Sequence, residues 1–402
     1  MLLSAALVVL AVPVLLWTTY LAVLAVLSWG PVPGCRDPLP SAVELTKFDV
    51  VVPAHDEAAG IAETVRALVA MEYPADRRRV LVVADNCRDD TARLAREAGA
   101  TVLERCDEDR RGKGYALQYA FDTVFRDAFA DAVVVVDADT RVTANLLRAF
   151  DARLRSGARA VQAEYRVLNP QASWRTRLMR IGFTLFHDVR SRARERLSVS
   201  TGLRGNGMAF SVALLKEVPH QAFSIVEDVE YGIRLGLAGH RVHYAGEAQV
   251  FGEMVSSEAA SRSQRRRWEG GRGALAKQYA SKLLGEAIRR RSLVLFDLAA
   301  DLLVPPLTYV VLAALVGTLA AAAWMRFGSG SWRIIAPWGA AWMGLFVYVI
   351  RGAWLAHVGP RVILDLAWAP VYMVWKVVLA TRPGAKNRGE WVRTARGGEK
   401  VP

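Results

Sequence analysis

VVVVDADT (residues 133–140) is the stretch of sequence that decides the fold class. Its apolar run is typical of a buried strand, and two carboxylates follow that strand directly. In an extended segment the side chains of Asp137 and Asp139 point the same way, so they can share one hard divalent cation. Ligands of open α/β sheets bind at the carboxyl ends of the strands. The stretch therefore predicts an α/β domain with a ligand site at this edge.

Two earlier apolar runs end in acidic residues as well. The run at 48–52 leads into His55-Asp56-Glu57, and the run at 80–83 leads into Asp85. One such carboxylate could merely cap the next helix, but three together favour a common site. Strands and helices alternate over about 47–248, which predicts a mostly parallel sheet. No Gly-x-Gly-x-x-Gly follows the first strand, which argues against a nicotinamide-binding fold.

Three further motifs lie downstream in the same region. Lys113 in RRGKGYAL stands between glycines, where its ammonium could approach a phosphate, although a solvated loop lysine is the alternative. LRGNGMAFS (203–211) predicts either a turn at which backbone approaches a ligand or a plain loop. Glu227-Asp228 begins a helix, where acidic residues also interact favourably with the helix dipole.

A basic stretch follows this acidic helix start. It contains QRRRW (264–268), and residues 262–291 hold ten Lys or Arg against two Glu, a net charge of +8. We expect much of this charge to bind anionic lipid.

Apolar stretches at both ends of the chain predict membrane helices. Residues 2–29 carry no charge, and about 20 apolar residues suffice to cross a bilayer. In 293–325 acidic residues and a Pro-Pro pair interrupt the first part, so the span is expected to begin near 305. Residues 334–357 predict a third span, and 362–380 an interfacial helix. Basic residues flank the central body, which therefore faces the cytosol in a multi-pass protein of the cell (inner) membrane.

Composition fits a soluble catalytic body joined to such helices. Of 402 residues, 53% are hydrophobic and 23% charged, which excludes a disordered chain. The net charge of +13 favours anionic surfaces or ligands. Three cysteines without metal-ligand spacing argue against a disulfide framework and against a zinc site.

The ordered set of motifs resembles the membrane-bound glycosyltransferases of family 2, which include cellulose, chitin and hyaluronan synthases and ceramide glucosyltransferases. The set comprises Asp85, Lys113, Asp137-x-Asp139, Glu227-Asp228 and Gln264-x-x-Arg267-Trp268. The resemblance covers about 48–290 and implies a GT-A-type nucleotide-sugar-binding domain. This chain departs from many synthases at Asp85-Asn86-Cys87 and at 203–207, which concerns the identity of the acceptor.

The resemblance also implies a role for each motif residue. A UDP-sugar donor would contact Ala54, Glu57, Asp85 and Asp137, and Asp139 with Asp137 would hold Mg²⁺ or Mn²⁺. Lys113 and Arg267 would neutralise the departing UDP, while Asp228, beside Glu227, would take the acceptor proton with inversion. The residues expected to contact the acceptor are Trp268, Gln264, Gly205, Asn206 and Gly207.

Together these features predict a metal-dependent inverting enzyme that extends a β-linked polysaccharide from UDP-sugars. Three spans offer little material for a secretion pore, which favours the alternative of single-sugar transfer to a lipid, or else a homo-oligomer or a secretion partner. A non-enzymatic anion-binding protein is a further alternative. Aromatic residues do not interleave as a stacking platform, so no nucleic-acid partner is expected.

The expected segments run in order along the chain. They are an N-terminal transmembrane helix (1–30), a cytosolic GT-A domain (47–255), amphipathic interfacial helices with QRRRW (256–292), two transmembrane helices preceded by an interfacial segment (293–358), and an interfacial helix with a basic cytosolic tail (359–402).

Overall fold

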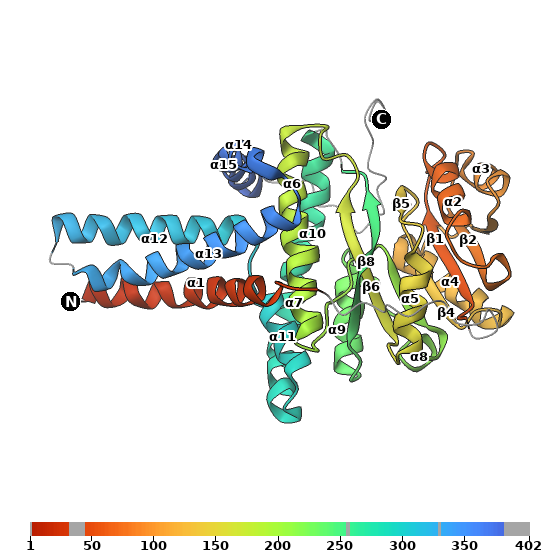
Figure 1. Cartoon of the computed structure of the whole chain (residues 1–402), viewed down its shortest axis with the longest axis horizontal. Helices are drawn as coiled ribbons and strands as arrows, with labels where there is room; N and C mark the ends of the chain where they lie inside the picture. The colour runs from red at the N-terminus through yellow and green to blue at the C-terminus, as the bar shows by residue number, and fades with distance from the viewer. Residues whose placement is uncertain (1, 32–44, 255–257, 329–330, 382–402) are drawn as a thin grey trace.

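The valine run of 133–136 lies in the middle of an eight-stranded mixed sheet (Figure 1). The computed structural model describes residues 2–31, 45–254, 258–328 and 331–381, and the side chains of 258–269 and 379–381 lie outside this description. The strand order is β3-β2-β1-β4-β7-β6-β8-β5. The strands are β1 (Phe48–Ala54), β2 (Arg78–Asp85), β3 (Thr101–Arg105), β4 (Ala132–Val135), β5 (Thr140–Val142), β6 (Ala160–Val167), β7 (Met208–Ser211) and β8 (Val242–Gly252).

The sheet has a parallel half and a mixed half. Strands β3, β2, β1 and β4 run parallel, so the acidic ends of β1, β2 and β4 meet at one edge. Strand β7 inserts antiparallel between β4 and β6, while β6 and β8 are parallel and β5 is antiparallel to β8. The sheet is therefore mixed, with parallel pairing in four of the seven neighbouring pairs of described strands.

Helices cover both faces of the sheet because successive strand residues point to opposite sides. Val50 and Val52 pack with α2, α3 and α5 on one face, whereas Val51 packs with α4, α8 and α9 on the other. Each central strand is thus buried on both sides. These helices are α2 (Ile61–Val69), α3 (Thr91–Glu97), α4 (Lys113–Asp127), α5 (Leu146–Arg155), α8 (Val212–Glu217) and α9 (Glu227–Leu237), with a 3₁₀ turn, η2, at Ala75–Arg77.

A layer of long helices lies between the sheet and the N- and C-terminal apolar helices (Figure 1). One rod is formed by α6 (Trp174–Phe183), the π-helical η3 (Thr184–Val189) and α7 (Arg190–Arg196). Beside it, α10 (Glu258–Arg290) packs on α11 (Leu293–Leu303) through Leu283 and Leu295. This layer therefore joins the sheet to the apolar helices.

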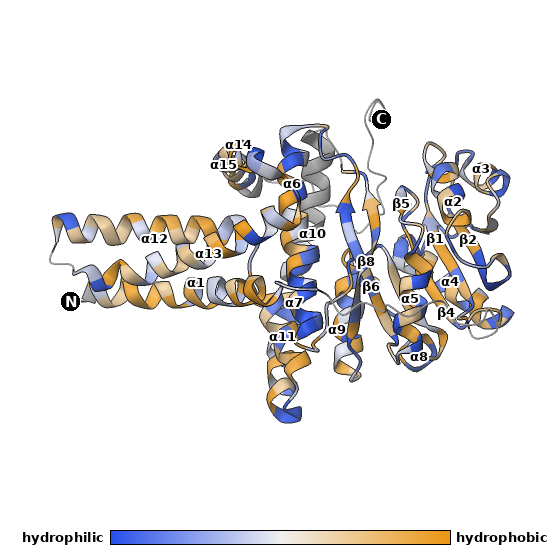
Figure 2. Ribbon diagram, viewed as in Figure 1, coloured by the Kyte–Doolittle hydropathy of each residue, from blue (hydrophilic) through white to orange (hydrophobic). Residues whose placement is uncertain are grey.

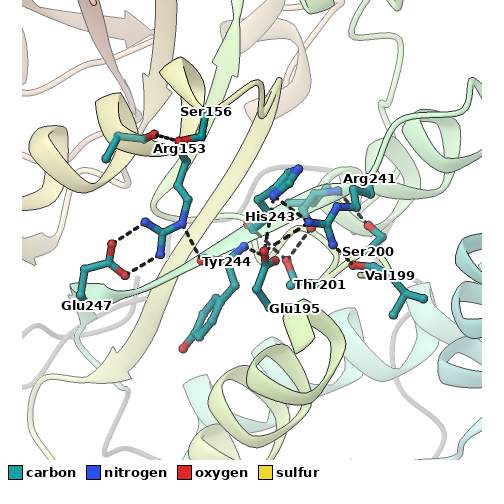
Figure 3. Close-up of polar contacts among 12 residues, drawn as sticks. Arg153, Ser156, Glu195, Val199, Ser200, Thr201, Arg241, His243, Tyr244 and Glu247 are labelled. Carbon is teal, nitrogen blue, oxygen red and sulfur yellow. Dashed lines mark hydrogen bonds and ion pairs between the residues drawn. The ribbon is translucent and has the colours of Figure 1, made fainter. Parts of the chain in front are cut away.

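Strand β8 is fastened to helices on either side of it (Figure 3). Arg153 of α5 donates to both carboxylate oxygens of Glu247, at 2.7 and 2.9 Å. On the other side, Glu195 of α7 accepts a hydrogen bond from the Tyr244 backbone at 2.9 Å and lies 3.4 Å from Arg241. The Glu195 contacts fix the rod of α6, η3 and α7 against the sheet, whereas the Arg153 contact fixes α5.

Among the described residues, three helices are long and apolar enough to span a membrane. They are α1 (Leu2–Leu27), α12 (Leu307–Phe327) and α13 (Ala336–Leu355), the last preceded by the 3₁₀ turn η4 (Trp332–Ile334). Figure 2 shows them largely in the colours of apolar residues. Large apolar side chains such as Val9 and Leu319 point outward, as contact with lipid requires. The expected fold class, a GT-A-type α/β domain with such helices at both ends, is confirmed.

The residues after α13 form short helices beside α6. These are η5 (Gly359–Arg361), α14 (Val362–Ala367) and α15 (Ala369–Thr381). Trp368 stacks on Trp174 with ring centroids 5.4 Å apart, and Asp365 pairs with Arg177 at 2.8 Å. The expected basic tail, 382–402, lies outside the described residues.

Candidate active site

The turn after β1 is tied to the end of β2. His55 Nδ1 lies 2.7 Å from the backbone oxygen of Asp85, and the Glu57 backbone donates to Thr91 Oγ1 at 2.8 Å. Asp56 adopts a left-handed conformation, with φ of +54°. The end of β1 at Ala54 and the turn that carries Glu57 therefore lie at the same sheet edge as Asp85, as the parallel pairing requires.

Only one of the two carboxylate oxygens of Asp85 has a hydrogen-bond partner among the described residues. The residue is 1% exposed, and Oδ1 accepts a hydrogen bond from Arg105 at 2.6 Å. Oδ2 is buried and has no hydrogen-bond partner among the described residues. Burial raises the pKa of Asp85, and Arg105 opposes that shift. A buried acceptor without a partner is rare in proteins, which makes Oδ2 a candidate ligand contact.

Lys113 connects three segments of the site. It begins α4, and its Nζ lies 2.6 Å from Asp137 Oδ1 and 3.7 Å from Glu227 Oε1. The same ammonium donates to the backbone oxygen of Gly205. The end of β4, the start of α9 and the 203–207 turn thus converge on one cation.

The 203–207 turn depends on glycine at two positions. Gly205 and Gly207 have φ of +78° and +66°, a region that disfavours other residues. A Cβ on Gly205 would lie 3.4 Å from Asp228 Oδ2, and one on Gly207 would lie 2.7 Å from Val250. The backbone at Gly205 therefore lies directly against Asp228, whereas Gly207 packs into the sheet.

Asn206, an expected acceptor contact, is fully buried between the two glycines. Its Nδ2 donates to Thr140 Oγ1 at 2.7 Å, and its Oδ1 accepts from the Asp137 backbone at 3.1 Å. The amide therefore holds both ends of the 137–140 segment and is not accessible to an acceptor.

The site has more negative than positive charge. Burial raises the pKa of Glu227 to about 7; Lys113 opposes this shift and Asp228 adds to it. Burial also raises the pKa of Asp228. Burial alone would lower the pKa of Lys113, but Asp137, Glu227 and Asp228 raise it above its ordinary value. Such carboxylate crowding around one ammonium is typical of a functional site.

Tyr165 is a site neighbour that the sequence did not indicate. Burial raises the pKa of its hydroxyl, and Asp137, Asp139 and Asp228 raise it further, so this tyrosine adjoins all three carboxylates. Its ring packs on Phe183 of α6 with centroids 5.5 Å apart. It stands within β6 without a motif around it, and only the strand pairing brings it to the site.

The sequence model of glycosyltransferase like family 2 matches residues 46–271, more than half of the chain. The chain belongs to this family. This is the family that the motif resemblance implied.

Curated relatives differ in what they act on. Probable glycosyltransferase YdaM of Bacillus subtilis is 26% identical over 266 residues, which is 63% of this chain and 61% of that protein. Glucomannan 4-beta-mannosyltransferase 1 of Oryza sativa is 25% identical over 65% of this chain and 52% of its own length. Beta-monoglucosyldiacylglycerol synthase of Synechocystis is 29% identical over 58% and 49%. The chain spans about half to three-fifths of the length of these relatives.

The fold also matches that of a solved mannosyltransferase. The mannosyltransferase PcManGT from Pyrobaculum calidifontis superposes with a TM-score of 0.58 at 20% identity, over 89% of this chain and 99% of that one. The matched share of this chain is larger than the sheet and its covering helices alone.

A second ionic cluster lies within the helix layer. Asp301 Oδ1 lies 2.7 Å from Arg190 and 2.6 Å from Arg194, and Oδ2 lies 3.1 Å from Arg272. Asp297 pairs with Arg194 at 3.0 Å and accepts from the Tyr20 hydroxyl of α1 at 2.8 Å. We call these residues the interface cluster. It joins α1, α7, α10 and α11.

The QRRRW segment forms part of α10, and its side chains lie outside the described residues. The contacts expected of Gln264, Arg267 and Trp268 therefore stay predictions. The helix itself passes close to the site, because a Cβ on Gly271 would lie 2.9 Å from Val226, the residue before Glu227.

Proposed function

We propose that this glycosyltransferase transfers a sugar from a UDP-sugar to an acceptor hydroxyl at the membrane surface, with inversion and with a divalent metal. The carboxylates of Asp137, Glu227 and Asp228 around Lys113, at the parallel strand ends, carry this proposal. Such a set combines a metal-binding edge, a phosphate-binding cation and a proton acceptor in one place.

The donor set of Asp137 and Asp139 fits Mg²⁺ or Mn²⁺, which prefer carboxylate oxygens. Asp137 is 31% exposed in its side chain, and Asp139 is partly exposed two residues on, so both can reach a ligand. A bound divalent cation would stabilise negative charge on the departing diphosphate. PcManGT was solved with GDP-Man and Mn²⁺, which supports a metal-dependent donor site.

Donor recognition is proposed for the turn after β1 and the end of β2. The unpartnered Asp85 Oδ2 can accept a hydrogen bond from the nucleobase, with Ala54 and Glu57 lining the same edge. Lys113 would contact the diphosphate, and Arg267 is proposed as the second cation on that diphosphate.

Asp228 is proposed as the general base. As the acceptor oxygen bonds to the anomeric carbon, the bond from that carbon to the diphosphate oxygen breaks and UDP leaves. The acceptor proton passes to Asp228, whose raised pKa suits a proton acceptor. Glu227 and Gly205 hold Lys113 beside it, so Glu227 orients the ammonium as well as adding charge.

A lipid is the better of the two acceptor classes. The described chain has three helices that could cross a membrane, which is little material for a polysaccharide channel. The glucosyldiacylglycerol synthase of Synechocystis is named for a lipid product, whereas the rice relative is named for glucomannan, so elongation of a polysaccharide stays the second candidate. We place the protein in the cell membrane with its catalytic body in the cytosol, divided into segments as the sequence predicts.

Product analysis tests this function directly. Purified full-length protein is incubated with Mn²⁺ and a panel of labelled UDP-sugars and GDP-mannose in membrane extract, and nucleotide release and labelled product are measured. We expect release from a UDP-sugar and label in the organic phase. Label in a long water-soluble polymer would establish the second candidate, and absence of release from every donor would refute the enzyme.

A further inference from the structure

A cavity of about 510 Å³ lies where the catalytic sheet meets the helix layer and the end of a candidate span. Its walls come from β5, β6 and β8, from α6 and η3, and from Ala356, the residue after α13. The volume is within the range of small-ligand pockets. A ligand in this cavity would touch both the catalytic body and the membrane end of the protein.

The lining combines cations with apolar surface. It includes Arg141, Arg166 and Arg180, no acidic residue, and apolar groups such as Phe183 and Phe251. An amphiphile with an anionic head fits such a wall better than a neutral or a purely polar molecule, because arginine pairs with phosphate through two parallel hydrogen bonds.

Arg180 is the arginine that most needs a partner. Arg141 pairs with Glu63 at 2.5 Å and Arg166 pairs with Glu164 at 2.6 Å. No carboxylate in the part of the chain that the structure describes lies within ion-pair distance of Arg180, which donates to the His357 backbone oxygen at 3.4 Å. Burial and the neighbouring Arg166 lower the pKa of Arg180, and Asp365, beyond ion-pair distance, only partly opposes them. A bound anion would stabilise the charged form of Arg180 and so oppose both of these effects.

The cavity also adjoins the catalytic carboxylates. Arg141 follows Asp139 by two residues, and Phe183 packs on Tyr165, which borders Asp137 and Asp228. A head group held by the arginines would therefore lie next to the transfer site, and its apolar chains could run along α13 into the bilayer.

We propose that this cavity binds the phosphate of an anionic lipid, and that this lipid belongs to the acceptor class of the transfer reaction. The assignment of this lipid to the acceptor class rests on the proposed function, whereas the binding of the lipid phosphate does not.

Isothermal titration calorimetry on the full-length protein in dodecyl maltoside tests the binding. The probes are dihexanoylphosphatidylglycerol, which has a phosphate and free hydroxyls, dihexanoylphosphatidylcholine, and inorganic phosphate. We expect the phosphatidylglycerol Kd to be at least about tenfold lower than that of either other probe, and Arg180→Gln to raise it about tenfold, roughly the loss of one charge-assisted contact.

Two further variants separate binding from folding. Arg141→Gln changes an exposed lining residue and should weaken phosphatidylglycerol several-fold. Arg289→Gln removes an exposed arginine paired with Glu286, away from the cavity lining, and should leave the Kd unchanged. Thermal melting identifies any variant that fails to fold. If Arg180→Gln fails to fold, the Kd of Arg141→Gln for phosphatidylglycerol decides whether the cavity is the binding site.

Each outcome has one meaning for the site. Equal affinity for phosphatidylcholine, or lining variants with the wild-type Kd, would overturn it, and equally tight inorganic phosphate would make it a free-phosphate site. UDP release measured in parallel separates the two proposals. Release without lipid binding rejects the cavity alone, whereas lipid binding without release from any UDP-sugar rejects the proposed function alone.

Discussion

The candidate active site and the interface cluster both combine acidic and basic side chains, but in opposite balance. At the candidate active site Asp137, Glu227 and Asp228 surround one ammonium. In the interface cluster three arginines surround Asp301. Burial opposes ionisation in both places, yet the pKa of Asp301 is far below its ordinary range because Arg194, Arg272 and Arg190 outweigh burial, whereas that of Glu227 rises to about 7.

This contrast shows how burial alone fails to distinguish structure from function. A buried carboxylate with enough cations is satisfied and joins elements together. A buried carboxylate group with too few cations retains affinity for a metal ion, a proton or a substrate. Substitutions that remove a carboxylate from one group of charges or the other test this difference.

The largest expected effect is at the metal-binding edge. Asp139→Asn should abolish metal-dependent turnover, because a neutral amide is a much poorer ligand for Mg²⁺ or Mn²⁺ than a carboxylate. UDP release is measured against Mn²⁺ concentration, with the exposed Asp122→Asn as control. Wild-type activity and metal dependence in Asp139→Asn would show that the metal assignment is wrong.

Asp228→Asn should lower transfer by about 10²–10⁴-fold while UDP affinity is kept, because the variant lacks the proton acceptor and little else. Single-turnover transfer and UDP titration measure the two properties separately. If the variant instead lost its fold, Asp228 would resemble the interface carboxylates, and the contrast would disappear.

Asp301→Asn should act on stability and leave the chemistry unchanged. Removing one member of a buried charge cluster costs about 3–5 kcal/mol, since the arginines are left uncompensated. Thermal melting of the detergent-solubilised protein checks the loss, and kcat of the folded fraction should match wild type. A large fall in kcat at unchanged melting temperature would place the interface cluster in the catalytic machinery.

The smallest effect is the pH dependence. Because the pKa of Glu227 is raised to about 7 and that of Asp228 is raised as well, the pair keeps a proton below neutrality. A base that holds its proton is inactive, so kcat/KM should fall by up to about tenfold per pH unit once the pair takes up its proton, and level off at higher pH. Glu227→Gln removes one of the coupled charges and should shift the midpoint downward. A flat profile from pH 5 to 8 contradicts the raised pKa.

Much of the site was predictable from local sequence. Buried strands have recognisable apolar runs, and the residues that follow them in a parallel sheet must share an edge, which is how Asp85 and Asp137 were placed together. The helix start at Glu227 was also expected, whereas the start of α4 at Lys113 and the ion pair between these two residues were not specified by the motifs. The three candidate spans follow from length and apolarity.

Other features depend on pairings between distant segments, and local pattern does not encode those. The antiparallel insertion of β7 makes the sheet mixed and buries Asn206, which the sequence had placed at the acceptor. Tyr165 reaches the carboxylates only through β6.

By itself the sequence determined the strands, the apolar helices and the order of the catalytic motifs, because each depends on neighbouring residues. Tertiary structure alone decided which charges meet. Tyr20 and Asp297 are 277 residues apart and hydrogen-bonded, Arg190 and Asp301 are 111 residues apart, and the cavity gathers three arginines from β5, β6 and α6. The energy of a charge depends on its distance to other charges and to water, and only the folded chain sets those distances.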